Sequence, residues 1–284
     1  MTPARAAAGL LLVAGLIVGT ASDTLVRREP MRSGEYLVLA ADFHVHSFPG
    51  DGTLTAFSLR DEAMRAGLDV IAIVNHNAFA GPRLIPWLPT DSNAPLVVPA
   101  EEITNAQYHL IAVGVDERIA PDGPVTDVVA RVHARGGLAI AAHPARDFRG
   151  YHTDAALSAV DGLEVARADT RERDRRDYVA AFERARRLNP HVAAIGSSDM
   201  HTTIGMGDSR TYLFVREPNV AGVLEAIRAG RTVAENDRGE LFGDPDLVTV
   251  VRSAAPPGRT DAHRWPRRIA VALAWLGLAG LVFA

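Results

Sequence analysis

Residues 41–52 read Ala-Asp-Phe-His-Val-His-Ser-Phe-Pro-Gly-Asp-Gly, and this stretch determines the predicted fold and site. It follows the apolar run 36–40, which is typical of a buried strand. Because side chains alternate across a strand, His44 and His46 leave it on the same face. Two imidazoles at the end of a strand are a possible pair of metal ligands, although an isolated His-x-His also fits a solvated surface. The rest of the sequence favours the metal site.

Four further apolar runs end in side chains of the same chemistry. They are followed, in chain order, by His76; by Glu101, Glu102 and His109; by His143; and by Asp199 and His201, while Asp51 lies in the loop after the opening pair. Each one alone has a structural explanation, such as a boundary residue or a helix N-cap. Together at one rim they would be a cluster of unpaired polar groups unless cations bind them. Nitrogen and oxygen donors without sulfur suit Zn, Mn or Fe(II).

Strand-like and helix-like segments alternate from residue 36 to about residue 251. We expect strands at 36–44, 69–74, 95–99, 109–115, 138–142, 161–165, 192–196 and 211–215, and helices at 55–66, 126–135, 173–188 and 219–230. Repeated strand–helix units with apolar strands predict a parallel sheet in the α/β class. About seven or eight such units predict a closed barrel whose site lies at the C-terminal ends of the strands. The Pro-rich segments 81–95 and 116–124 are expected to be loops.

Composition excludes several classes of protein. The 284 residues carry a net charge of −4 with no basic stripe, so bulk binding of nucleic acid is not indicated. The absence of cysteine excludes disulfides and thiolate metal sites. All 30 basic residues are arginine, which we interpret as the codon bias of a GC-rich, bacterial genome.

Both ends of the chain are hydrophobic. Residues 6–21 and 269–284 are uncharged runs of 16 residues each, shorter than the roughly 20 that span a bilayer comfortably. The first is either a secretory signal, cleaved after Gly19-Thr20-Ala21, or an uncleaved anchor. The second is either a membrane segment or a buried terminal helix.

The flanking arginines would place the middle of the chain in the cytoplasm, whereas a cleaved signal would place it outside, so the side of the membrane stays open. We therefore expect a membrane-associated protein with three parts. They are a hydrophobic segment and linker (1–34), a catalytic barrel (35–251), and a second linker with a C-terminal hydrophobic segment (252–284).

Six motifs, in this order, resemble the polymerase and histidinol phosphatase (PHP) superfamily. They are Asp-x-His-x-His-Ser with a downstream Asp-Gly, Ile-Val-Asn-His-Asn, Val-Val-Pro-Ala-Glu-Glu-Ile-Thr, Ala-Ala-His-Pro, Asp-Gly-Leu-Glu-Val and Gly-Ser-Ser-Asp-Met-His. The likeness covers about residues 38–235 and is greatest to the stand-alone phosphoesterases, including metallohydrolases of the carbaryl-hydrolase type. It implies a distorted (β/α)7 barrel, two or three divalent ions (Mn, Zn or Fe), and hydrolysis of phosphoesters.

The resemblance also implies a role for each candidate ligand. His44, His46, Glu102 and Asp199 match a first metal site; Glu102 bridges to a second with His109 and His143; and Asp51, His76 and His201 match a third. Glu101 is expected to support the site or the fold, because the family's ligand directly precedes Ile-Thr. Asn75 stands where the family commonly has Asp, which removes a charge that could orient an imidazole of the third site.

The predicted reaction is attack on a phosphoester by a metal-activated hydroxide in a di- or trinuclear site. Asp199 or His201 could move a proton as well as bind metal. Arg146 and Arg167 follow strand ends and are predicted to bind the phosphate oxygens of a small-molecule or nucleotide-type substrate. His152 could also contact the substrate.

Two alternatives remain open, and two further histidines are assigned no role in the site. The same site could hydrolyse a non-phosphate ester, an amide or a carbamate, or the chain could be a metal-binding membrane module without turnover. His133 and His191 are expected to be structural, because they fall on a helix and before a strand.

Overall fold

The computed structural model describes residues 2–22, 30–79, 82–87, 94–168, 170–202, 205–254 and 261–283. The chain divides into two compact units: residues 28–258, and the two terminal segments 1–27 and 259–284. All of the predicted site residues belong to the larger unit.

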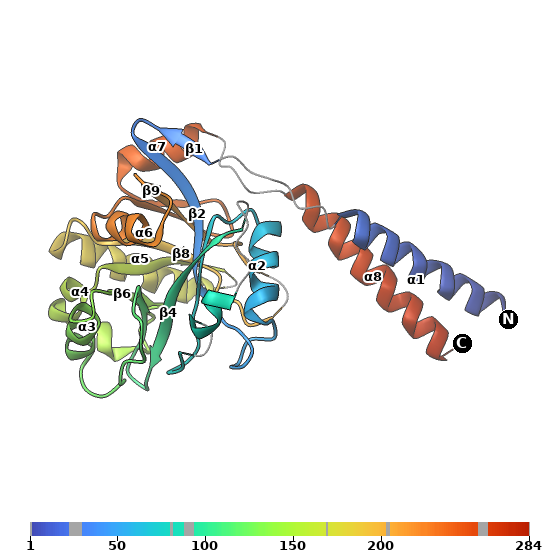
Figure 1. The fold of residues 1–284 in the computed structure, drawn as a ribbon, viewed down its shortest axis with the longest axis horizontal. Helices are drawn as coiled ribbons and strands as arrows, with labels where there is room; N and C mark the ends of the chain where they lie inside the picture. Colours follow the sequence, from blue (N-terminus) through green and yellow to red (C-terminus); the bar gives the residue numbers. More distant parts are fainter. Residues whose placement is uncertain are drawn as a thin grey trace. The chain divides into compact units, whose positions relative to one another are not determined.

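The larger unit is a mixed sheet surrounded by helices (Figure 1). Its strands are β1 (Met31–Ser33), β2 (Tyr36–Val45), β3 (Val70–Ile73), β4 (Leu96–Thr104), β5 (His109–Val113), β6 (Leu138–Ala142), β7 (Gly162–Arg167), β8 (Ala193–Ser197), β9 (Arg210–Val215), β10 (Thr232–Glu235) and β11 (Leu241–Gly243). Its helices are α2 (Ala56–Arg65), η1 (Pro82–Trp87), α3 (Val125–His133), η2 (Arg149–Tyr151), α4 (Asp154–Ala159), α5 (Glu172–Leu188), α6 (Val220–Arg228) and α7 (Pro245–Ser253).

The strands pair in the order β11-β10-β9-β2-β3-β4-β5-β6-β7-β8, with β1 on the side of β2. The pairs β2–β3, β3–β4, β6–β7 and β7–β8 are parallel, whereas β5 and β9 are antiparallel to both of their neighbours. The expected wholly parallel sheet is therefore wrong at these two strands. For β5 the reason is the short connection from Thr104 to His109, since a parallel partner needs a crossover of a dozen or more residues.

The sheet curves into a nearly closed barrel, which confirms the predicted barrel fold. Thr211 on β9 bonds to β8 with its side chain: the hydroxyl accepts from the Gly196 amide (2.9 Å) and donates to the Gly196 carbonyl (2.8 Å). A side chain at Gly196 would collide with the backbone of Arg210, 2.2 Å from its carbonyl oxygen. Strands β8 and β9 therefore meet through the Thr211 hydroxyl and Gly196, and not through a regular ladder of backbone hydrogen bonds.

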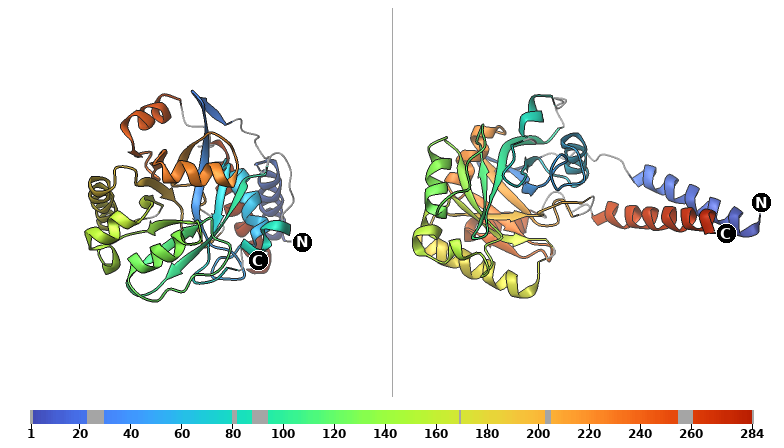
Figure 2. Two further views of the ribbon diagram at one scale, coloured as in Figure 1. Left: turned by 60° about the vertical axis from the view of Figure 1, so that its left-hand side comes forward. Right: turned by 90° about the horizontal axis from the view of Figure 1, so that it is seen from below.

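Helices cover the outside of the barrel in two groups (Figures 1 and 2). Helices α3, α4 and α5 pack one side, where Val128, Leu157 and Phe182 belong to one buried cluster with side chains of β6 and β7. Leu59 of α2, which packs on β3, and Val251 of α7, which packs on β10 and β11, belong to a second buried cluster. These stripes of buried side chains agree with the helical periodicity of the sequence.

Some predicted loops and linkers contain short elements or lie outside the described residues. Of the loop predicted at 81–95, residues 82–87 form η1, and residues 81 and 88–93 lie outside the described residues. Of the linkers, residues 23–29 and 255–260 also lie outside them, while 31–33 form β1.

The smaller unit consists of two helices, α1 (Pro3–Ser22) and α8 (Asp261–Phe283), which pack against each other. Among the described helices, α1 is long and apolar enough to cross a membrane, and Ile269–Phe283 of α8 is a shorter apolar segment.

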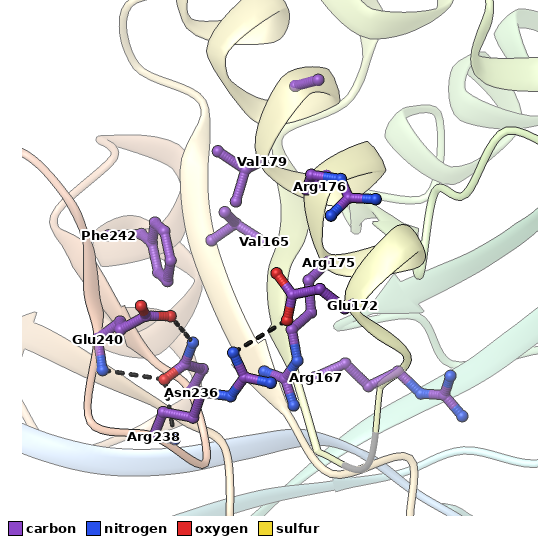
Figure 3. Close-up of a pocket in the computed structure, with 11 residues that line it drawn as sticks. Val165, Arg167, Glu172, Arg175, Arg176, Val179, Asn236, Arg238, Glu240 and Phe242 are labelled. Carbon is purple, nitrogen blue, oxygen red and sulfur yellow. Dashed lines mark hydrogen bonds and ion pairs between the residues drawn. The ribbon is translucent and has the colours of Figure 1, made fainter.

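A pocket of about 440 Å³ lies outside the barrel wall, between β7, α5 and the β10–β11 strands (Figure 3). Its apolar wall includes Val165, Val179 and Phe242. The rest of the lining is mostly polar, and two of its arginines are held in ion pairs: Arg238 with Glu172 (3.0 Å) and Arg175 with Asp237 (2.8 Å). Arg167 also lines the pocket, but its guanidinium extends away from the other side chains there.

Candidate metal centre

The end of β2 places two imidazoles inside the barrel mouth. His44 and His46 are both fully buried. The buried carboxylate of Asp42 accepts hydrogen bonds from the backbone amides of His44 (3.1 Å), Ser198 (3.1 Å) and Gly207 (3.2 Å). Burial raises the pKa of Asp42 to about 6, although the hydrogen bonds that its carboxylate accepts act to lower the pKa. Asp42 therefore ties the first two candidate ligands to the loop that follows β8.

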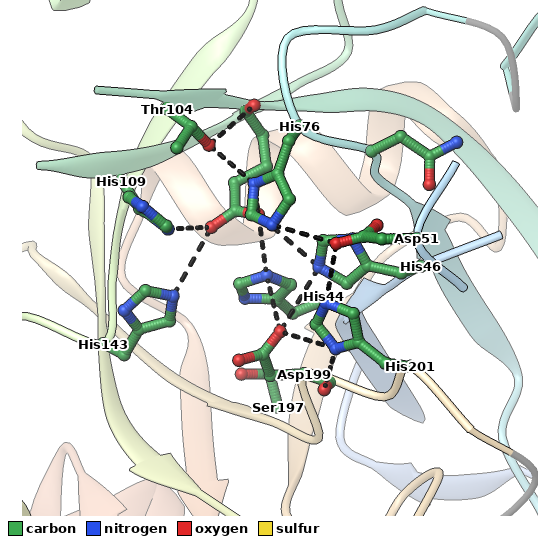
Figure 4. Close-up of polar contacts among 12 residues, drawn as sticks. His44, His46, Asp51, His76, Thr104, His109, His143, Ser197, Asp199 and His201 are labelled. Carbon is green, nitrogen blue, oxygen red and sulfur yellow. Dashed lines mark hydrogen bonds and ion pairs between the residues drawn. The ribbon is translucent and has the colours of Figure 1, made fainter. Parts of the chain in front are cut away.

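Glu102 lies at the centre of the cluster and is fully buried. Its Oε1 atom lies 2.8 Å from His109 Nδ1 and 3.4 Å from His143 Nε2. Its Oε2 atom lies 3.4 Å from Nε2 of both His44 and His46. In Figure 4 the imidazoles of His109 and His143 lie on one side of the cluster, and those of His44 and His46 lie on the other. Glu102 comes from β4 and His109 from the adjacent β5, so one hairpin supplies both.

Asp199 closes the cluster from the loop after β8. Its Oδ1 atom lies 3.2 Å from Nε2 of both His44 and His46. Its Oδ2 atom is paired with the guanidinium of Arg167. Asp199 has φ = +52° and His143 has φ = +28°. Such backbone conformations are uncommon for residues other than glycine and concentrate at functional sites.

A second group of side chains lies at the more exposed edge of the mouth. Asp51 Oδ1 is 3.0 Å from His46 Nδ1, and Asp51 Oδ2 is 3.2 Å from His76 Nε2 and 3.1 Å from His201 Nε2. The loop that carries Asp51 turns so tightly that a Cβ on Gly52 would lie 2.1 Å from the His46 carbonyl oxygen. Only glycine fits there, and this brings Asp51 back over His46.

Asn75 holds the same loop from β3. Its Oδ1 atom accepts from the Ser47 amide (2.9 Å), and its Nδ2 atom donates to the Ser47 hydroxyl (3.0 Å) and the Pro49 carbonyl (3.3 Å). Among the described residues, its side chain makes no hydrogen bond to an imidazole. An aspartate could not donate to the Pro49 carbonyl, so the amide has a direct structural use at this position.

The residues present fit a set of divalent cations. Four groups of side chains each bring one ligand atom apiece within 4.8 Å of one another; they are His46, Asp51, His76 and His201; His44, His46 and Glu102; His44, His143 and Asp199; and His76, Glu102 and His109. Ligands about 2.0–2.2 Å from one ion lie within that span. Within the described part of the chain, His44 Nε2, His46 Nε2 and Glu102 Oε2 are buried without a hydrogen-bond partner. Such groups are costly to bury unless something binds them.

The electric field in the cluster attracts positive charge. Burial opposes ionisation of Glu102 and Asp199, but His44 and the neighbouring donors outweigh it and hold the pKa of both carboxyls well below the usual range. Burial disfavours the charged form of His44 as well, yet Asp199, Glu102 and Glu164 raise its pKa well above 6.5. For His46, burial outweighs the neighbouring carboxylates and lowers the pKa of the imidazole. A divalent cation would satisfy the same carboxylates.

Sequence reasoning did not assign a role to two residues that hold the imidazoles in place. The buried carboxylate of Glu164 accepts from His44 Nδ1 (2.8 Å), from the His143 amide (2.6 Å) and from the Ser197 hydroxyl. Thr104 Oγ1 lies 2.7 Å from His76 Nδ1. Both belong to the quoted motifs, as the Glu of Asp-Gly-Leu-Glu-Val and the Thr of Glu-Glu-Ile-Thr, and this was their only signal.

The two predicted phosphate-binding arginines differ in position. Arg167 contacts Asp199 and is 30% exposed in its side chain, so it borders the cluster. Arg146 instead forms a bidentate pair with Asp177 on α5, both contacts being 2.9 Å. His152 Nε2 donates to the Arg146 carbonyl (2.9 Å), away from the four groups.

The remaining residues considered from the sequence lie outside the four groups. His133 pairs with Asp161 (2.7 Å) on the outside of the barrel. His191 is exposed, and its amide is bonded to Asn189. Glu101 points away from the cluster, accepts from the Ile119 amide and has its pKa raised to about 7 by burial.

No protein-family model matches the sequence, and a search of curated proteins gives no match. Solved structures do resemble the chain. A two-domain protein of Bacteroides vulgatus that contains a predicted PHP-like metal-dependent phosphoesterase aligns with a TM-score of 0.61 and 22% identity, covering 81% of this chain and 74% of that one. PsfC of Pseudomonas syringae aligns with a TM-score of 0.53 and 17% identity, covering 77% and 96%.

A third similar structure is that of an endonuclease. The lesion-specific endonuclease EndoQ of Pyrococcus furiosus aligns with a TM-score of 0.50 and 14% identity, and the match covers 67% of this chain and 56% of that one. At such identities the likeness concerns the fold. The chain therefore shares its fold with the two-domain protein that contains a PHP-like domain.

Proposed function

We propose that the chain is a metal-dependent hydrolase that cleaves a phosphoester with two or three divalent ions. The observation that carries the proposal is a set of buried polar atoms that lack a hydrogen bond and face one centre at the barrel mouth; among the described residues they are His44 Nε2, His46 Nε2 and Glu102 Oε2. The fold shared with a PHP-like phosphoesterase supports the same chemistry. The donors are nitrogen and oxygen only, which suits Mn, Zn or Fe(II).

The nine proposed ligands are His44, His46, Asp51, His76, Glu102, His109, His143, Asp199 and His201. When bound, divalent ions supply Lewis acidity toward a phosphoester and lower the pKa of water. The chain's own residues hold and orient the reactants. Glu102 contributes one oxygen to each side of the cluster, and Asp199 directs one oxygen to the histidines and the other to Arg167.

Substrate contacts are proposed on the exposed edge of the cluster. Arg167 has a side chain that is 30% exposed, so its guanidinium can add a hydrogen bond to a phosphate oxygen. His201, 34% exposed in its side chain, can exchange a proton with a leaving group or with solvent. Arg146 would have to leave Asp177 to take part. We propose a small-molecule or nucleotide-type phosphoester as the substrate.

The test combines metal analysis with a panel of phosphomonoester, phosphodiester and aryl ester substrates in the presence of Mn(II) or Zn(II). We expect more than one equivalent of metal and turnover of a phosphoester. His46→Ala should lose both, whereas His133→Ala, with its imidazole on the outer surface, should keep both. Turnover of the aryl ester alone would favour a non-phosphate substrate, and full occupancy without turnover would favour a non-catalytic module.

The terminal helices are proposed to attach the protein to a membrane. Helix α1 has 20 residues, which at 1.5 Å per residue is about 30 Å, the thickness of the hydrocarbon core. Recovery of the full-length chain in the membrane fraction, resistant to high-salt washing, is the expected result. Recovery in the soluble fraction without detergent would contradict it.

A further inference from the structure

The two terminal helices meet through small residues, backbone against backbone. A Cβ built on Gly15 of α1 would lie 2.6 Å from the Ala274 amide nitrogen, and one on Gly277 of α8 would lie 2.4 Å from the Leu12 amide nitrogen. Neither distance leaves room for a side chain. The contacts run antiparallel, because Gly280 and Gly277 face Ala8, whereas Gly15 and Gly19 face Ala270.

Large apolar side chains lie on the outside of this pair. The exposed fractions include 71% for Leu10, 63% for Ile17, 66% for Trp275, 62% for Leu276 and 63% for Val282. Residues 6–22 and 269–283 contain no charged residue. This is the reverse of a water-soluble helix pair, which buries its large apolar residues and exposes charges. Small residues between helices and large apolar residues around them are typical of helices packed in lipid.

We propose that α1 and α8 form an antiparallel transmembrane hairpin, in which α1 is a retained anchor and not a cleaved signal peptide. The occupant of the outer apolar surface is bilayer hydrocarbon. Cleavage after Ala21 would remove the surface that covers Ala270 and Gly277, both of which are buried by α1. The proposal does not depend on the enzymatic activity.

The hairpin also determines on which side of the membrane the catalytic unit lies. Residues 28–258 connect to the C-terminal end of α1 and the N-terminal end of α8, which lie at the same end of an antiparallel pair. The sequence near this end contains Arg27, Arg28, Arg32, Arg264, Arg267 and Arg268, whereas the opposite end has only Arg5. Arginine near the ends of membrane helices is retained in the cytoplasm. The catalytic unit therefore lies on the cytoplasmic side of the membrane.

The chain contains no cysteine, so the pairing can be tested with introduced disulfides. A Cβ on Gly19 lies 3.6 Å from the Cβ of Ala270, within the 3.5–4.5 Å that a disulfide requires. The full-length G19C/A270C variant should therefore form an intramolecular disulfide in isolated membranes under mild oxidation. G9C/A270C is the matched control, because a Cβ on Gly9 meets no described atom within 4 Å.

Several results would overturn the hairpin. A cross-link no stronger than in the control would reject the observed pairing, and a disulfide between two chains would replace it with a dimer contact. A mass spectrum of the membrane-bound protein that lacks residues 1–21 would show that α1 is cleaved. The intact mass, with the disulfide present, is the expected outcome.

Orientation is tested by labelling single cysteines with a membrane-impermeant maleimide in spheroplasts. Thr2→Cys, beyond the far end of α1, should react in intact spheroplasts. Ser158→Cys, on the exposed face of α4, should react only after lysis. Labelling of Ser158→Cys in intact spheroplasts would place the catalytic unit outside, and protection of both sites until lysis would reject a transmembrane hairpin.

Discussion

Replacement of Glu164 by Gln tests whether the cluster is held ready for cations by its surroundings. Glu164 is fully buried and ionised: burial opposes its charge, but His44 nearby lowers its pKa. It accepts three hydrogen bonds, from His44 Nδ1 (2.8 Å), from the His143 amide (2.6 Å) and from the Ser197 hydroxyl. Glutamine keeps the shape but offers a single acceptor oxygen, so one of these donors must face an amide NH2.

The expected loss follows from this count. One hydrogen bond to a charged group, lost in a buried position, costs about 1.5–3 kcal/mol. If the cost falls on the orientation of His44 and His143, it lowers metal affinity roughly 10- to 100-fold, the range usual for partners of metal ligands. If it fell only on folding, metal affinity would not change.

The assay measures metal affinity by competition with a chromophoric chelator, and stability by urea unfolding with and without metal. Glu183→Gln, on the exposed face of α5, is the matched control and should behave as the wild type. A Glu164→Gln protein that is less stable yet binds metal within about twofold of the control would refute the reasoning, since Glu164 would then support the fold alone.

Three further predictions address other parts of the site. His44→Ala should lose bound metal and activity together, as read by elemental analysis and turnover; a folded, fully metallated and active variant would reject the site. Arg167→Ala should retain its metal but lower kcat/KM by roughly 10- to 100-fold, the loss of one charge-assisted hydrogen bond to the substrate; unchanged kinetics would remove Arg167 from the substrate site. Asn75→Asp should lower the free energy of unfolding by about 1–3 kcal/mol, because the donor to the Pro49 carbonyl is gone. The variant should therefore unfold at a lower urea concentration. A more stable Asn75→Asp protein would show that the amide has no such use.

Most strands of the barrel could be predicted because each is a continuous apolar run bounded by turns. The strand expected at 138–142 is β6 to the residue, and the one expected at 36–44 is one residue shorter than β2. Strand direction could not be predicted in the same way, because the antiparallel strands β5 and β9 are buried along nearly their whole length, as parallel strands usually are. The short strands β10 and β11, of four and three residues, carry too little pattern to be recognised.

The candidate site was predictable to a similar degree. Residues at strand ends, such as His143 and Asp199, could be found because a rim gathers them from distant parts of the chain. Glu164 was not assigned, because a carboxylate inside a strand gives no sign of what it faces. The use of Asn75 could not be anticipated either. It depends on how closely the next loop approaches, and a Cβ on Gly50 would lie 2.8 Å from the Asn75 side chain.

The sharing of side chains between neighbouring groups has a thermodynamic consequence. His44, His46, His76 and Glu102 each belong to two of the four groups in the barrel mouth. Occupation of one position therefore alters the charge and geometry offered to the next, and by reciprocity each ion changes the affinity of the other by the same factor. If more than one ion binds, the centre would fill and empty as a coupled set, and the arrival of a scarce metal at one position would determine how tightly the others are held.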